Sequence, residues 1–409
     1  MQQQCKIVVV DRKVLAMVDS STLGFENKKN RIKDFDGLSR VGKNSVGRYF
    51  GLKLHPVLVY DQKTKMMLGI SSCQFVKRAT LTNEEQGDPR MRFKLAIEDK
   101  ESYKWISACE QSSEVLAEAS HVTYVMDREA DIIELLDRVP NDKTSLVVRI
   151  KHDRYVHDQA GNRMKLSKLF KGSKVRGHTS LQIDSKKRKK REARMDICYE
   201  RVIIPWGKNK ETTEKRMNPQ GIPMTVVQIK ESQHEGYASE PELVWKLYTT
   251  ENITNLQQAL QIVDIYKSRW LIEEFFKLIK TDGYNIEATE LTTGKAIRKL
   301  TLYVMKSSVK VQQLKAARDG KSIMKITQLF TDDEVECLKL LNKKVEGRTI
   351  KQQNPHPSNS IGFASWVIAR LGGWKGFYKK SNPPGTKTFV WGLEKFENLY
   401  QGYQLKDVS

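Results

Sequence analysis

The stretch Val122-Thr123-Tyr124-Val125-Met126-Asp127 indicates a buried strand that ends at a carboxylate. Helical spacing over 131–136 follows it, and Val139-Pro140 closes that helix. A further strand pattern covers 145–150, only a few residues later. Strand, helix and strand in close succession favour an α/β fold.

Strand patterns also dominate the N-terminal part of the chain. Apolar runs predict strands at 6–10, 14–18, 52–60 and 66–76. The first two are separated by Asp11-Arg12-Lys13 and predict a hairpin, and Asp19 directly follows the second. The later two meet at Asp61-Gln62. This meander indicates a mixed sheet with an antiparallel part, and a helix is predicted at 112–119.

Residues 155–252 alternate short β-like runs with Gly, Pro and polar turns, which indicates a β-rich insertion. Strands are predicted there at 195–204, 224–229 and 243–248. The basic run Lys186-Lys187-Arg188-Lys189-Lys190-Arg191 fits either a mobile, solvated loop or a loop that contacts DNA phosphates. The run alone leaves both interpretations open.

The remainder of the chain is predicted to be mostly helical. Helical patterns cover 256–281, 294–317, 365–371 and 387–400. Breaks fall at Asp282-Gly283 and at Asn382-Pro383-Pro384-Gly385. The last helix carries an apolar stripe that suits intramolecular packing or a dimer: Val390, Leu393, Phe396, Leu399 and Tyr400.

The chain is strongly basic, with 71 Lys and Arg against 49 Asp and Glu and a net charge of +22. Such an excess favours a polyanionic partner, most commonly nucleic acid. The 5 cysteines are scattered, so neither a zinc knuckle nor a disulfide framework is indicated. No apolar run approaches the length of a membrane span, and Met1-Gln2-Gln3-Gln4 does not begin a signal peptide. We expect a soluble, cytoplasmic protein without membrane partners.

One face of the helix at 256–281 gathers polar side chains. Within a sector roughly 80° wide lie Tyr266, Arg269, Glu273, Lys277 and Lys280. The opposite side is apolar: Leu271, Ile272, Phe275, Leu278 and Ile279. An ordinary solvated face would pair Glu273 with Lys277 at i,i+4, and the spacing permits that interpretation. Arg and Tyr before the Glu, and a second Lys after it, are better suited to phosphates.

Three carboxylates are candidates for metal chemistry. Asp19 and Asp127 each follow a predicted strand, where side chains commonly line a crevice. One such Asp is more often a turn former or helix cap, but two together with Glu273 can hold divalent ions. Two ions so held clamp the attacking and leaving oxygens of a phosphodiester. Glu129 and Asp131 are rival ligands, and Asp127 is favoured because it is nearest the strand.

These motifs resemble those of a known family. The spacing Tyr266-x2-Arg269-x3-Glu273-x6-Lys280 resembles the YREK signature of bacterial DDE-type insertion-sequence transposases of the IS-four family. Asp127-Arg128-Glu129-Ala130-Asp131-Ile132 resembles the second-aspartate motif of that family, and Val18-Asp19-Ser20-Ser21 resembles the first. The tail is similar too, in Leu371-Gly372-Gly373-Trp374, Pro384-Gly385 and Trp391.

The resemblance implies a ribonuclease H-like core, a mixed sheet flanked by helices, with a β-rich domain inserted between the second Asp and the Glu. The expected organisation is a first core part at 1–154, the insertion at 155–252, a second core part with the signature helix at 253–345, and a helical C-terminal region at 346–409. The last region also suits dimerisation.

The resemblance further implies that Asp19, Asp127 and Glu273 hold two Mg²⁺ ions, for which Mn²⁺ substitutes. The implied reactions are phosphodiester hydrolysis at transposon ends, hairpin formation and strand transfer into target DNA, by a homodimer engaged on double-stranded DNA near the bacterial nucleoid. The residues implied to contact DNA are Tyr266, Arg269, Lys277, Lys280, Arg149 and Lys151. Trp245 would stack on a flipped base, whereas its spacing alone favours a core residue of a strand.

Members of that family usually carry a DNA-binding domain before the first catalytic strand, whereas the hairpin predicted here begins at Lys6. We therefore expect salt-dependent DNA binding with little preference for transposon ends. A second hypothesis is a catalytically incompetent, N-terminally truncated chain that binds DNA or dimerises and inhibits full-length transposase. The presence of all three carboxylates favours the enzyme. A third, a general ribonuclease H-like nuclease, fits the signature face and Trp245 less well.

Overall fold

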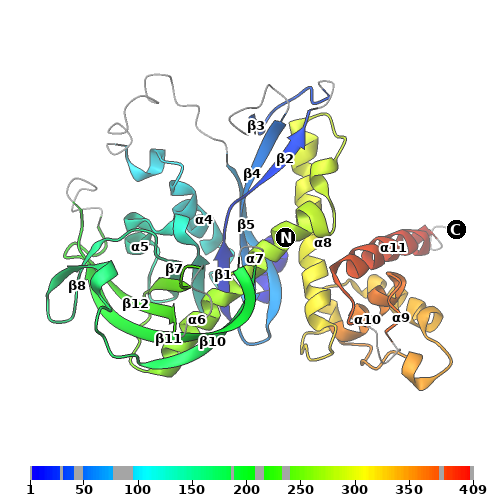
Figure 1. The fold of residues 1–409 in the computed structure, drawn as a ribbon. Helices are drawn as coiled ribbons and strands as arrows, with labels where there is room; N and C mark the ends of the chain where they lie inside the picture. Colours follow the sequence, from blue (N-terminus) through cyan, green and yellow to red (C-terminus); the bar gives the residue numbers. More distant parts are fainter. Residues whose placement is uncertain are drawn as a thin grey trace.

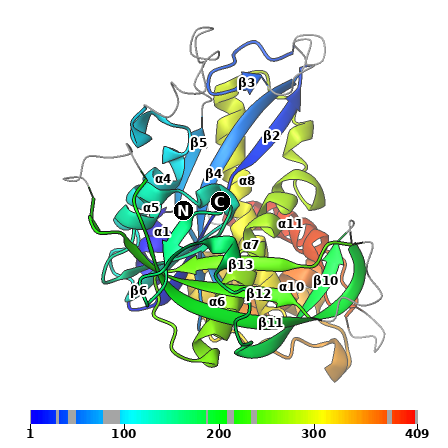
Figure 2. The ribbon, with the colours of Figure 1, turned by 60° about the vertical axis from the view of Figure 1, so that its left-hand side comes forward.

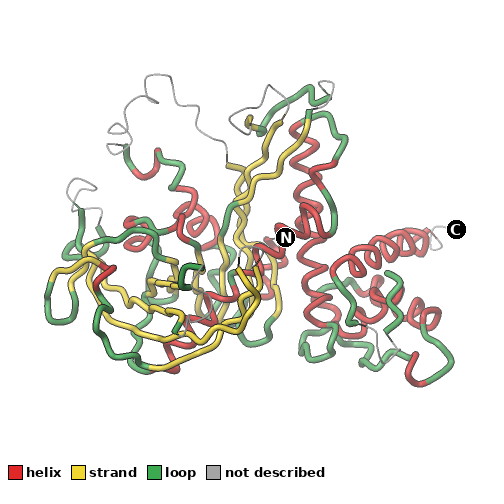
Figure 3. Tube along the Cα trace, in the orientation of Figure 1, coloured by secondary structure: helices red, strands yellow, loops and turns green. Residues whose placement is uncertain are grey.

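The computed structural model describes residues 2–27, 31–40, 49–76, 95–185, 188–207, 216–232, 240–376 and 382–405. A twisted mixed sheet forms one side of the molecule, and a group of helices forms the other (Figures 1 and 3). The long helix α8, Gly294–Ala317, stands between them. In the described part of the chain, no helix is long and apolar enough to cross a membrane.

The core of the sheet is built around β1. The strands are β1 (Lys13–Val18), β4 (Tyr49–Asp61), β5 (Met66–Val76), β6 (His121–Met126) and β7 (Thr144–Arg149). β1 is antiparallel to β4 and parallel to β6, β5 is antiparallel to β4, and β7 is parallel to β6. This arrangement confirms the predicted α/β class with a mixed sheet, and it is compatible with a ribonuclease H-like core.

A narrow extension of the sheet rises beside the first half of α8 (Figure 2). It consists of β2 (Ser21–Glu26), β3 (Ser39–Arg40) and the first half of β4. Because β2 begins two residues after Asp19, the extension starts where the central strand ends.

The segment predicted to be a β-rich insertion does consist of strands. They are β8 (Tyr155–His157), β9 (Arg163–Lys165), β10 (Gly177–Ser185), β11 (Arg188–Ile204), β12 (Ile222–Glu231) and β13 (Val244–Thr249). β13 pairs antiparallel with β7, Leu247 lying opposite Arg149. The hydrogen-bonded sheet therefore continues from the core into the β-rich segment without a gap.

Two local predictions in the first half of the chain are wrong. Residues predicted as the first hairpin strand lie largely in helix α1, Gln2–Val8, because both edges of β1 are already taken by β4 and β6. The apolar side chains of α1 are only partly buried, and Ile7 remains 66% exposed. The helix predicted at 112–119 is α4, Tyr103–Ser113, which ends where the prediction began. A short apolar run cannot by itself distinguish a strand from a helix.

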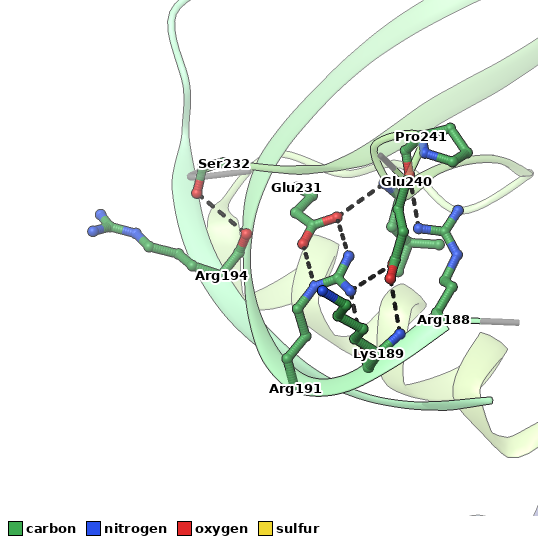
Figure 4. Close-up of polar contacts among 9 residues, drawn as sticks. Arg188, Lys189, Arg191, Arg194, Glu231, Ser232, Glu240 and Pro241 are labelled. Carbon is green, nitrogen blue, oxygen red and sulfur yellow. Dashed lines mark hydrogen bonds and ion pairs between the residues drawn. The ribbon is translucent and has the colours of Figure 1, made fainter. Parts of the chain in front are cut away.

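Lys186 and Lys187 of the basic run lie outside the described residues. From Arg188 onward the run is strand β11, so the loop interpretation is wrong there. Arg191 is buried between two carboxylates, with its Nε 2.9 Å from Glu231 and Nη1 2.8 Å from Glu240, as Figure 4 shows. A buried guanidinium needs such partners, because an unpaired charge away from water is costly.

Helices form the second half of the chain, as predicted. They are α6 (Leu256–Ser268), α7 (Trp270–Lys277), α8, α9 (Asp332–Val345), α10 (Ile361–Leu371) and α11 (Thr386–Leu405), with the short α5 (Ile133–Arg138) in the core. The helix predicted at 256–281 is broken at Arg269 and ends in a π-helical turn, Leu278–Asp282.

The apolar stripe of α11 is used within the chain. Val390, Leu393 and Phe396 are buried against α9 and α10, whereas Leu399 is 46% exposed. Of the two uses predicted for this stripe, intramolecular packing accounts for its three most buried members. The remaining hydrophobic residues cover both faces of the sheet in two separate clusters.

Candidate active site

Asp19 and Asp127 lie side by side at the ends of two neighbouring parallel strands. Val18 of β1 is the register partner of Met126 of β6, and each carboxylate is the next residue along its strand. Paired strands are about 4.8 Å apart, so both side chains leave the same edge of the sheet. The Asp19 carboxylate accepts a hydrogen bond from its neighbour Ser20 N (2.7 Å), and Asp127 accepts one from Glu129 N (2.8 Å).

Arg269 joins the third carboxylate to this pair. Its Nη1 lies 3.0 Å from Asp19 Oδ2, and its Nη2 donates to Glu273 Oε1. Arg269 occupies the break between α6 and α7, and Glu273 lies one turn later on α7. The guanidinium is 14% exposed and the Glu273 side chain 35% exposed, so the site is accessible from the Glu273 side.

The carboxylates interact electrostatically. The pKa of Asp19 is raised from 3.8 to about 6, first by burial and then by the negative charge of Asp127, with a smaller contribution from Glu273 and an opposing effect of Arg269. The neighbouring carboxylates therefore disfavour ionisation of Asp19, which is the usual result of gathering like charges in one place.

The donor chemistry of this site fits divalent ions. Three carboxylates supply the hard oxygen ligands that Mg²⁺ and Mn²⁺ prefer, and their mutual repulsion would be relieved by a dication. Among the described residues, no three His, Cys, Asp or Glu side chains are already arranged as a metal site. Here Arg269 lies between Asp19 and Glu273 and supplies the positive charge instead.

The carboxylates of the two rival ligands, Glu129 and Asp131, contact basic residues other than Arg269. Asp131 is buried, ion-paired with Arg154 (2.8 Å), and accepts hydrogen bonds from the backbone N of Lys151 and His152. Glu129 is largely exposed, and its carboxylate lies 3.6 Å from Lys104 Nζ. The contacts of Asp131 are those of a residue that fixes the turn after β7.

A second group of predicted residues gathers around Tyr266. This phenol is only 4% exposed and lies edge-on to the Trp245 ring, with 5.2 Å between ring centroids. Arg149 lies 5.8 Å from the Trp245 ring, and Arg269 lies 5.9 Å from the Tyr266 ring. Arg269 therefore connects this aromatic group to the carboxylates.

The predicted lysines do not all join the site. Lys277 is 65% exposed and pairs with Asp282 (2.7 Å) rather than with Glu273. Lys280 donates a hydrogen bond to the backbone O of Thr22 (2.7 Å), near the start of β2 in the sheet extension. Lys151 is exposed beside the strand end of β7. The Glu273–Lys277 pair expected of an ordinary solvated helix is thus replaced by Glu273–Arg269.

Sequence reasoning missed one residue that holds the loop after Asp19. His55 of β4 is fully buried, and its Nδ1 is 2.8 Å from the hydroxyl of Ser20. Burial, followed by the charges of Lys104 and Lys53, lowers its pKa to about 3, so the ring is neutral near pH 7. A lone histidine inside an apolar strand gives no local signal of this contact.

Replacing Asp19 by Asn is expected to stabilise the metal-free protein at high pH. A folded pKa near 6 against 3.8 unfolded means that the stability due to Asp19 is present below pH 4 and lost as pH rises through 6. In EDTA, the unfolding free energy of Asp19→Asn minus that of wild type should therefore rise by about 1–3 kcal/mol from pH 4 to pH 8. Urea unfolding at both pH values measures it.

Asp61→Asn is the matched control with the opposite sign. Burial acts to raise the Asp61 pKa, but hydrogen bonds from Thr64 and Arg12 outweigh burial and lower it. Its stabilising contribution is therefore present at high pH and lost as pH falls. The same trend with pH for both variants would contradict the electrostatic description of the site.

Part of the chain matches a known protein family. Residues 106–305 match the family model described as "Transposase DDE domain". The matched segment begins on α4 and extends into α8, so it contains Asp127 and Glu273, whereas Asp19 lies before it. The match supports a DDE transposase, and with it DNA transposition in general terms. Such transposases generally use divalent metal ions.

Proposed function

We propose that the chain is a metal-dependent DNA transposase that cuts and rejoins phosphodiester bonds with Asp19, Asp127 and Glu273. The proposal is carried by two contacts: strand register brings Asp19 beside Asp127, and Arg269, which also pairs with Glu273, binds Asp19 from 250 residues away in sequence. The family match over residues 106–305 and the net charge of +22 support the same conclusion.

In this proposal Asp19, Asp127 and Glu273 would hold two Mg²⁺ ions. Bound there, the ions would activate the attacking oxygen and stabilise the leaving oxygen of an in-line displacement. Arg269 is placed to exchange its carboxylate partners for a phosphate, since guanidinium groups bind both in the same bidentate manner. Tyr266 lies beside Arg269, and Arg149 lies beside Trp245 in the same aromatic group.

The proposal also includes the individual reaction steps and the family assignment. Hairpin formation at the DNA end, strand transfer and the IS-four family assignment rest on the YREK spacing and on Trp245 beside Tyr266. Trp245 is partly buried and packs against the second core cluster, so part of its surface remains accessible to a base.

Trp245→Ala is expected to spare the first nick and to slow hairpin closure about tenfold or more, because stacking on one base is worth about 1–3 kcal/mol. Trp245→Phe should restore part of the rate, since stacking requires only an aromatic face. Denaturing gels of end-labelled DNA separate nicked and hairpin products. Equal loss of both steps, with a large fall in melting temperature, would assign Trp245 a core role only.

The proposed function is tested by incubating the purified chain with a plasmid that carries its coding sequence and the flanking genomic DNA. We expect nicked and excised products in Mg²⁺ or Mn²⁺, and none in EDTA. A folded chain that binds this DNA yet leaves it intact in both metals would refute catalysis and favour the inhibitor hypothesis. Cleavage of RNA in preference to DNA would instead identify a general nuclease.

A further inference from the structure

Helix α8 has an unusual charge pattern. Its sequence contains six cations and no Asp or Glu: Lys295, Arg298, Lys299, Lys306, Lys310 and Lys315. Two pairs of like charges lie at i,i+4, namely Lys295 with Lys299 and Lys306 with Lys310. Such pairs destabilise a helix unless acidic groups nearby neutralise the charges. A solvated helix would normally mix the two signs along its face. The pattern therefore calls for acidic partners outside the helix.

Half of these cations have such partners elsewhere in the chain. Arg298 pairs with Asp36 in the sheet extension. Lys310 lies 3.3 Å from Glu334 of α9, and Lys315 lies 3.2 Å from Glu274 of α7. These three acids come from the segment between β2 and β3, from α9 and from α7.

The other three cations line one bare face. Lys295, Lys299 and Lys306 are exposed and form no ion pair with any residue that the structure describes. At 100° per residue they fall, with Tyr303, in a sector roughly 80° wide and extend over roughly 16 Å. Tyr303 is 71% exposed. We call Lys295, Lys299, Tyr303 and Lys306 the α8 stripe.

The next position along the stripe shows what covers it. Lys310 continues the same face, and it is surrounded there by Glu334 of α9, by Phe330 just before α9 and by Phe396 of α11. Its Nζ lies 4.1 Å from the centre of the Phe330 ring and 6.0 Å from that of Phe396. The C-terminal helices thus neutralise one end of a basic row and leave the rest uncovered (Figure 1).

The uncovered row leads away from the candidate active site. The second half of α8 packs on α7, with the Gln312 amide donating to Leu271 O and Lys315 pairing with Glu274. Along the axis, Lys306 lies roughly 9 Å before Gln312 and Lys295 roughly 26 Å before it. By the same count of 100° per residue, Gln312 and Lys315 point roughly 140–160° away from the centre of the α8 stripe, so the stripe lies on the side of α8 opposite to α7.

We propose that the α8 stripe binds the sugar-phosphate backbone of duplex DNA outside the candidate active site. Three ammonium groups are point charges that neutralise phosphates without reading bases, and the Tyr303 hydroxyl adds a phosphate donor. The proposal rests on the proposed function, because that function supplies DNA as the anionic partner.

The test compares wild type with Lys295→Gln/Lys299→Gln/Lys306→Gln in binding a 40-base-pair duplex from 50 to 200 mM salt without metal. Losing three phosphate contacts lowers the salt slope by about 2.7, so the affinity gap between the two proteins should shrink roughly 40-fold over that range. The matched control is Lys343→Gln/Lys344→Gln/Lys351→Gln, three exposed lysines of the C-terminal region. It should change the slope by less than about 1.

An unchanged slope in the α8 variant, or an equal change in the control, overturns the proposal. If wild type cleaves DNA in Mg²⁺ while the slope is unchanged, only the α8 stripe is refuted. Wild type that neither binds DNA in a salt-dependent way nor cleaves it refutes the proposed function as well. A loss confined to an end-bearing duplex identifies transposon DNA as the occupant, and an equal loss on unrelated duplex identifies any DNA, including the target.

Discussion

Glu273→Gln is expected to lower the rate of DNA cleavage at least about a thousandfold while leaving DNA binding nearly intact. The substitution keeps the size of the side chain but removes the charge that would share a dication with Asp19 and Asp127. Metal-assisted stabilisation of a phosphodiester transition state is worth several kcal/mol, and each 1.36 kcal/mol is a factor of ten in rate. Single-turnover cleavage of labelled duplex in Mg²⁺ measures the loss.

Glu274→Gln is the matched control for this experiment. Glu274 is the adjacent residue on α7, lines the same surface pocket as Glu273, and pairs with Lys315 instead of Arg269. It should cleave within a few-fold of wild type. Cleavage by Glu273→Gln at the wild-type rate, or an equal loss in both variants, would show that Glu273 is no ligand of the reacting metal.

Phe396→Ala is expected to lower the unfolding free energy by about 3–5 kcal/mol, because removing a fully buried aromatic ring leaves a cavity. Phe396 is 0% exposed and lies edge-on to Phe330, with 5.8 Å between ring centroids. Leu399→Ala, on the same α11 stripe but 46% exposed, should cost less than about 1 kcal/mol. Urea unfolding at two protein concentrations measures both values.

These two variants also separate the two uses of the α11 stripe. If the stripe packs only within the chain, the free energy of unfolding does not depend on protein concentration. If instead Leu399→Ala were the more damaging change, and its effect grew on dilution, the stripe would serve a dimer.

Long periodic patterns were the most informative part of the sequence. The strands β5 and β6 and the helix α8 were predicted nearly to the residue, because each carries a sustained pattern ended by a turn or a break. The order strand, Asp, helix around Asp127 likewise fixed the α/β class. Short runs failed, since residues 6–10 could form a strand or a helix equally well until β4 and β6 occupied both edges of β1.

Contacts between distant residues were not predictable in detail. Sequence spacing placed Arg269 and Glu273 on one helix face, but not Arg269 between Asp19 and Glu273, because that contact depends on how α6 and α7 dock on the sheet. The pairing of Arg191 with Glu231 and Glu240 was hidden for the same reason, and the basic run looked like a loop. Local sequence reports charge and periodicity, whereas ion-pair partners are set by tertiary packing.

We propose that Asp19 and Asp127, side by side at the ends of β1 and β6, bind divalent metal together with Glu273. Calorimetric titration of Mn²⁺ into wild type and into Asp19→Asn/Asp127→Asn measures this binding. We expect a saturable binding isotherm for wild type and none for the double variant, which should remain folded. Identical isotherms for the two folded proteins would show that these carboxylates do not bind the metal.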